Sequence, residues 1–98
     1  MANSVKPFQI HVPEEVLNDL FARIKNTRWP GEITDSDWDY GSNLAYVKEL
    51  CDYWVESFSW SDQEERLNKF PQFTTDVSGL NIHFIHKKGV GPDPIPLL

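Results

Sequence analysis

The chain has 98 residues, a formal net charge of −6 and a single cysteine, Cys51. This length holds one small domain at most, the negative charge disfavours nucleic acid as a partner, and one cysteine cannot form an internal disulfide. Because residues 1–6 are polar and no apolar stretch is long enough to cross a bilayer, we expect a cytoplasmic protein without a membrane partner.

Aromatic residues make up 13% of the chain and include four tryptophans: Trp29, Trp38, Trp54 and Trp60. A unit of this size has a large surface for its volume and buries so many large side chains with difficulty. One interpretation places these rings in a core, with a few left exposed. We favour a second interpretation, in which they pack against another body, since large exposed apolar patches mark interfaces.

The first part of the chain indicates an extended segment followed by a helix. In residues 1–12, apolar side chains alternate as in a short extended lead-in. Pro13 suits the first position of a helix, and the two glutamates after it favour the positive end of the helix dipole. Pro30 ends the pattern. The helix has one apolar face at helical spacing, formed by Val16, Leu17, Leu20, Phe21 and Ile24.

Residues 29–42 follow neither a helical nor a strand period. A long irregular stretch inside a compact unit is usually functional or lies over another surface. It holds two tryptophans and a tyrosine, too many aromatic rings for a free linker. We expect a meander that covers another part of a protein.

Two more helices are predicted after this stretch. The first covers residues 43–58, and the second begins at Ser61, where the spacing of Ser61 and Glu64 fits a capping box. The second helix ends before Pro71. The apolar stripe of the first consists of Leu44, Val47, Leu50, Cys51, Trp54 and Phe58.

The period then changes to that of β-strands. Alternating apolar residues in 73–77 and 80–84 flank Ser78-Gly79, a plausible hairpin turn. A loop rich in Gly and Pro covers 87–94, and residues 95–98 are expected to open a third strand. A strand that stops there would leave backbone groups unpaired, so we expect residues 1–98 to be the front part of something larger.

The carboxylates of Asp35, Asp37 and Asp39 alternate as in a calcium loop. Such a loop requires Gly at its sixth position and Glu at its twelfth, where this chain has Tyr40 and Tyr46. Capping and turn hydrogen bonds are the better explanation of these carboxylates.

Other candidate sites are also weak. His83 and His86 lie three apart on a predicted strand, so their side chains point to opposite faces and do not converge on one metal ion. A hydrogen-bonded strand histidine is the better interpretation. Cys51 lies on an apolar stripe, which favours packing over reactivity. Gly89 and Gly91 are not followed by a helix, as a phosphate loop would be. We expect no catalytic, cofactor-binding or metal-binding residue in this chain, and no cofactor.

Several spaced motifs nevertheless occur in a recognisable order from about Lys6 to Leu98. They are Lys6-Pro7-Phe8, Thr27-Arg28-Trp29-Pro30, Trp38-Asp39-Tyr40-Gly41, Tyr53-Trp54, Leu67-Asn68-Lys69-Phe70-Pro71-Gln72-Phe73 and Gly79-Leu80-Asn81-Ile82-His83-Phe84-Ile85-His86. This string resembles the N-terminal region of microsomal-type epoxide hydrolases, which are α/β-hydrolases.

The resemblance implies an α/β fold class: a helical meander in residues 1–71 that wraps the hydrolase core and lid, and in residues 72–98 the first β-hairpin and the start of a third strand of the α/β-hydrolase sheet. Such a fold is incomplete on its own. The first 98 residues contain no membrane anchor like that of microsomal members, which agrees with a soluble microbial-type member.

The family opens epoxides to vicinal diols in two steps. A carboxylate forms an ester with the substrate, and a histidine oriented by an acid then activates water to hydrolyse the ester. The resemblance places all of these residues outside residues 1–98. It implies as partners a small epoxide substrate and the remainder of the same hydrolase, its core and lid, either in the same chain or as a separate chain. It also implies a role in detoxification. A homodimer is an assembly that the sequence leaves open.

Two alternatives stand beside this interpretation. The chain could be a stand-alone module that binds a partner through its aromatic meander. It could also be the N-terminal part of another α/β-hydrolase that cleaves esters or haloalkanes, since function is set by the site and not by the fold.

Overall fold

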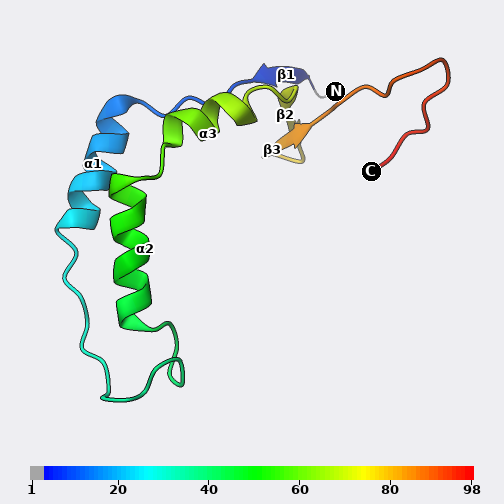
Figure 1. Ribbon diagram of the computed structural model, residues 1–98. Coiled ribbons are helices and arrows are strands. Elements are labelled where there is room, and N and C mark those ends of the chain that lie inside the picture. The colour runs from blue at the N-terminus through cyan, green and yellow to red at the C-terminus, as the bar shows by residue number, and fades with distance from the viewer. Residues whose placement is uncertain (1–3) are drawn as a thin grey trace. The chain divides into compact units, whose positions relative to one another are not determined.

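The computed structural model describes residues 4–98, which contain three helices and three strands. In chain order these are β1 (Val5–Phe8), α1 (Glu14–Lys25), α2 (Leu44–Glu56), α3 (Trp60–Leu67), β2 (Gln72–Val77) and β3 (Leu80–Ile85) (Figure 1). The chain forms two compact units. Residues 12–60 make up the helical unit, and the segments before and after them make up the sheet unit.

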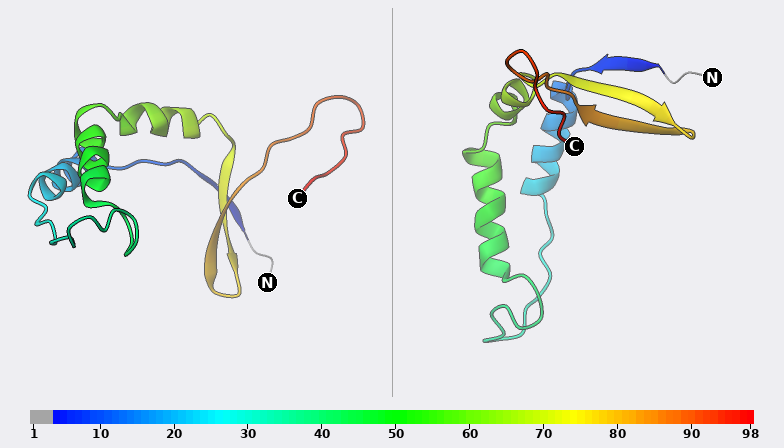
Figure 2. Two further views of the ribbon diagram at one scale, coloured as in Figure 1. Left: turned by 60° about the horizontal axis from the view of Figure 1, so that its bottom comes forward. Right: turned by 90° about the vertical axis from the view of Figure 1, so that its right-hand side faces the viewer.

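In the helical unit, α1 and α2 lie side by side, run in opposite directions and are joined by a long loop (Figure 1, Figure 2). α1 begins at Glu14, so Pro13 takes the N-cap position, one residue before the predicted place. The two glutamates of the first turn lie where the helix dipole favours negative charge.

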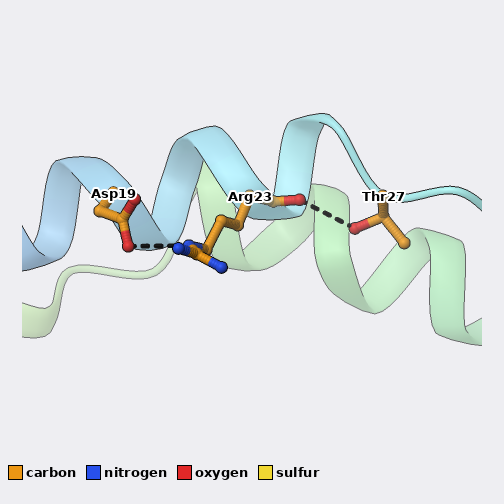
Figure 3. Close-up of polar contacts among 3 residues, drawn as sticks. All are labelled: Asp19, Arg23 and Thr27. Carbon is orange, nitrogen blue, oxygen red and sulfur yellow. Dashed lines mark hydrogen bonds and ion pairs between the residues drawn. The ribbon is translucent and has the colours of Figure 1, made fainter.

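A threonine side chain caps the C-terminal end of α1. The Thr27 hydroxyl lies 3.1 Å from the carbonyl oxygen of Arg23 and 2.7 Å from that of Ile24, which also accepts from the Thr27 backbone N–H at 3.2 Å. The hydroxyl thus adds a donor for the carbonyls of the last turn. Asp19 accepts a hydrogen bond of 2.8 Å from Arg23 Nε on the same helix (Figure 3). Both members of this ion pair are well exposed, so the pair contributes little to stability.

The loop residues before α2 cap its first turn. Asn43 is the N-cap, and its Oδ1 accepts a hydrogen bond of 2.9 Å from the Tyr46 backbone N–H. Glu32 Oε2 accepts one of 2.7 Å from the Leu44 N–H, and Asp37 Oδ1 accepts one of 3.1 Å from Asn43 Nδ2. The irregular stretch therefore determines where α2 begins.

The sheet unit contains an antiparallel sheet in the order β1-β2-β3. The predicted hairpin is confirmed: Ser78 and Gly79 connect β2 to β3 with φ of 52° and 81°, as a type I′ turn requires. Asp76 Oδ1 accepts a hydrogen bond of 3.1 Å from the Gly79 N–H. The paired residues run from Val5↔Thr75 to Phe8↔Gln72 and from Gln72↔Ile85 to Val77↔Leu80.

The start of the chain differs from the prediction of a merely extended lead-in. Val5–Phe8 form β1, an edge strand hydrogen-bonded to β2 (Figure 2). Pro7 lies within it, which an edge strand tolerates because one side of the strand needs no donors. Local sequence could not reveal the pairing, because the partner residues lie more than 60 positions away.

The junction between α3 and β2 is held by two amide side chains. Asn68 accepts from the Ile10 N–H and donates to the Ile10 carbonyl, each at 2.8 Å. Gln72, one of two buried polar residues in the described part, donates to the Leu67 carbonyl at 2.7 Å. α3 itself begins at Trp60, one residue earlier than predicted, so Ser61 lies inside the first turn.

Residues 95–98 have no secondary structure here, and Leu97 is 98% exposed. A strand exists only where a neighbouring strand supplies hydrogen-bond partners. The expectation that these residues open a third strand stays a prediction.

Among residues 4–98, no apolar side chain is buried. A domain that folds around its own core buries several of its Leu, Ile and Phe side chains. The apolar faces of the helices and of the sheet are therefore only partly covered by the described residues. No helix within the described range has both the length and the apolar character needed to cross a bilayer.

Candidate functional site

An apolar hollow on the helical unit is the main candidate site. It has a volume of about 510 Å³ and lies on the face that α1 and α2 share. Its lining side chains are aliphatic or aromatic, and its aromatic members are Phe21, Tyr53, Trp54, Phe58 and Trp60. A hollow of this size and character suits an apolar partner.

Side-chain exposure shows that the hollow is open. On α1, Val16 is 55% exposed; on α2, Leu50 is 51% and Tyr53 57% exposed. Apolar side chains that gather on one exposed face mark a surface for interaction.

The predicted stripe on the second helix is divided between two roles. Val47 and Cys51 lie half-buried and do not line the hollow, whereas Leu50 and Trp54 line it. Sequence reasoning missed Tyr53 as a lining residue, because a tyrosine beside a regular stripe reads as an ordinary surface residue. The apolar arc on this helix is wider than one stripe. That width was the available signal that one part of the arc could line a hollow while another part lies half-buried elsewhere.

None of the four tryptophans is fully buried by the described residues, since Trp29 and Trp60 are half-buried and Trp38 and Trp54 are exposed. The interpretation that these rings pack against another body stays a prediction. Trp38 is 52% exposed and contacts the Tyr46 ring with 5.3 Å between centroids. Lys48 Nζ lies 5.9 Å from the centroid of the half-buried Trp29 ring, a cation–π contact. These contacts hold the loop to α2 but leave both rings accessible.

The prediction of turn and capping hydrogen bonds for the acidic loop residues Asp35, Asp37 and Asp39 is confirmed, among residues 4–98, for the carboxylate of Asp37 alone. Asp35 and Asp37 adopt positive φ values of 59° and 47°, a conformation that aspartate tolerates in turns. Asp37 holds the N-cap residue Asn43. Within the described part of the chain, no group of three or more His, Cys, Asp or Glu side chains is placed to hold a metal ion.

The histidine prediction is confirmed for His83. Its Nε2 lies 2.9 Å from Gln72 Oε1, and its ring meets that of Phe8 edge-on with 5.0 Å between centroids. Because the Gln72 Nε2 already donates to Leu67, its Oε1 must accept, and His83 Nε2 is therefore the donor. His86 lies beyond the end of β3, with its ring 6.5 Å from that of Phe73. Neither histidine lies beside an arrangement of nucleophile, base and acid.

The negative charge is concentrated on the helical unit. Residues 12–60 contain ten acidic and four basic side chains, and the rest of the chain contains five of each, so the helical unit carries the whole net charge of −6. The apolar hollow thus lies on an acidic body.

Comparison with proteins of known structure defines the class. The crystal structure of juvenile hormone epoxide hydrolase from the silkworm Bombyx mori matches with a TM-score of 0.83 and 32% identity, over 93% of this chain and 24% of that one. The Aspergillus niger epoxide hydrolase matches with a TM-score of 0.74 and 34% identity, over 84% of this chain and 22% of that one. The helices and sheet correspond to the N-terminal part of α/β-hydrolase epoxide hydrolases, which confirms the predicted fold class.

Sequence comparison gives the family. A family model described as epoxide hydrolase N terminus matches residues 5–98. Epoxide hydrolase 1 of Sus scrofa is 44% identical over 85 residues, which cover 87% of this chain and 19% of that protein. The chain belongs to the epoxide hydrolase N-terminal family and spans about a fifth of the length of these relatives.

Proposed function

We propose that residues 1–98 act as the N-terminal region of an epoxide hydrolase that converts epoxides to vicinal diols through a covalent ester. The observation that carries this proposal is the family match, which extends over residues 5–98. The incompletely covered apolar faces support it, because a segment that completes a larger body leaves such faces for that body. The nucleophile, the base and the acid then lie in the remaining four fifths of the enzyme.

The proposed division of labour has two parts. Residues 1–71 wrap the core and the lid, and residues 72–98 contribute the first hairpin and the start of a third strand of the central sheet. β1 links the two, since it lies in the first part and is hydrogen-bonded to β2 in the second. We further propose a cytoplasmic enzyme that detoxifies small epoxides, with its core and lid in the same polypeptide.

Expression of the whole coding sequence that surrounds residues 1–98, followed by incubation with styrene oxide, tests the activity. The expected result is formation of the diol, with none from residues 1–98 alone. A single turnover in ¹⁸O-labelled water tests the ester. The first diol should be unlabelled because its new oxygen comes from the enzyme carboxylate, and the label should appear on that carboxylate.

Two results would contradict the proposal. A folded whole protein that opens no epoxide but cleaves esters or haloalkanes would assign the segment to another α/β-hydrolase. A cooperative unfolding transition of residues 1–98 alone, with the hollow protected from solvent, would favour a stand-alone binding module.

A further inference from the structure

The occupant of the apolar hollow can be inferred from the chemistry of its walls. The lining consists of aliphatic and aromatic side chains from α1, α2 and the residues next to them. Such walls offer very few hydrogen-bond partners to an extended backbone, and unpaired backbone groups held against them would be costly. A helix satisfies its own backbone and packs by fitting side-chain ridges into the groove between two other helices. A small ligand would meet no convergent polar groups to orient it.

The charge around the hollow indicates that its occupant is basic. Glu49 and Glu56 lie four residues before and three after Tyr53, which places them on the same side of α2 as this lining residue. Neither glutamate has an ion-pair partner among the residues that the structure describes. The basic residue of α2, Lys48, is held over Trp29.

The end of α2 adds to this negative field. Its last turn contains Glu56 and no basic residue, although the carbonyls of a helix C-terminus already carry partial negative charge. The arrangement is unfavourable within this segment alone. A cation brought by a partner would relieve both the carboxylate and the helix end.

The source of the occupant follows from chain length. The solved relatives are about four times as long as this segment, so most of an epoxide hydrolase is available to cover the hollow. We propose that the hollow receives a basic amphipathic helix from the remaining part of the same polypeptide, with an apolar stripe on Tyr53 and Trp54 and Lys or Arg side chains facing Glu49 and Glu56. This inference rests on the proposed function.

Photo-crosslinking in the whole protein identifies the occupant. A Tyr53→p-benzoylphenylalanine variant keeps an aromatic ring at a position that is 57% exposed. Irradiation and mass spectrometry should give an intramolecular cross-link to a helical peptide that carries Lys or Arg within four residues of the attachment point. The same photoreactive residue in place of Trp38, which does not line the hollow, is the control and should not label that peptide.

A charge-reversal experiment tests the sign of the interaction. The double variant Glu49→Lys, Glu56→Lys places one positive charge at the last residue of α2 and another two turns earlier. The charge at the helix end should stabilise the helix itself. If a basic helix occupies the hollow, the thermal midpoint of the whole protein should instead fall by about 1–2 °C. The double variant Asp39→Lys, Asp93→Lys changes the net charge equally without touching the hollow. The difference in thermal midpoint between the two double variants should diminish at high salt, because salt screens the charges.

The outcomes separate this inference from the proposed function. Cross-linking to a second copy, to a strand or to a helix without basic residues overturns the inference, as does the absence of any cross-link or a rise in the thermal midpoint. Diol formation is measured on the same sample. A protein that forms the diol but gives one of these results loses only the inference, whereas a protein that folds and forms no diol loses the proposed function.

Discussion

Replacing Asn68 with alanine removes the two hydrogen bonds that join the start of the chain to the α3–β2 junction. The amide group of Asn68 both accepts from and donates to the backbone of Ile10, each over 2.8 Å and across 58 positions in the sequence. The Asn68 side chain therefore makes the two hydrogen bonds that the backbone of a neighbouring strand would make to Ile10, which lies two positions beyond the end of β1.

The expected loss follows from these two bonds. A protein hydrogen bond contributes about 0.5–1.5 kcal/mol net, so the pair contributes about 1–3 kcal/mol to the free energy of unfolding. Both Ile10 and Asn68 are half-buried, so water reaches the freed groups only in part, and we expect a loss of about 2 kcal/mol. Asn68→Asp keeps the acceptor but places a carboxylate against the Ile10 carbonyl. This variant should therefore lower the free energy of unfolding by at least as much.

Urea denaturation of the whole protein measures this loss, and hydrogen exchange of the Ile10 amide tests its location. At a slope of at least about 2 kcal/mol per molar urea, the midpoint should fall by up to about 1 M. Asn81→Ala is the matched control, because Asn81 is exposed on β3 and its side chain makes no hydrogen bond within the described residues. A loss for Asn68→Ala no greater than that of the control, with unchanged exchange at Ile10, would refute the reasoning.

Three further substitutions test local features. Gly79→Ala should lower the free energy of unfolding by about 1–2 kcal/mol, because φ is 81° at this position of the hairpin turn. The control Gly31→Ala should be tolerated, since its Cβ would meet open space. Thermal melts of the two variants measure the difference. Thr27→Val should reduce the stability of α1 by about 0.5–1 kcal/mol, measured by urea denaturation, and no change would show that water replaces the hydroxyl. Asn43→Ala removes the cap on the Tyr46 N–H and should cost about 1 kcal/mol, with faster exchange of that amide; unchanged exchange would contradict the cap.

Local patterns predicted most of the elements. A helix that starts at Pro13 and a helix over residues 43–58 were expected from apolar spacing, and α1 and α2 begin within one residue of the predicted starts. The hairpin at Ser78-Gly79 followed from alternation on both sides of a turn dipeptide. These features depend on neighbours within a few positions of the chain, and such neighbours are visible in the sequence.

Features that depend on distant residues escaped prediction. The strand Val5–Phe8 exists because β2 pairs with it, and the amide of Asn68 reaches Ile10 only after the chain has folded back. The hollow is likewise the product of two helices that lie side by side, so neither helix alone showed that Tyr53 would line it.

The sequence by itself determined the family and the kinds of local element, because these follow from motif order and short-range periodicity. Only the tertiary structure decided which part of each apolar arc packs inward and which part stays open. Cys51 and Tyr53 lie two positions apart on α2, yet one is half-buried and the other is 57% exposed beside the hollow. Burial is set by which surface comes to lie opposite a side chain, and that surface comes from elsewhere in the chain.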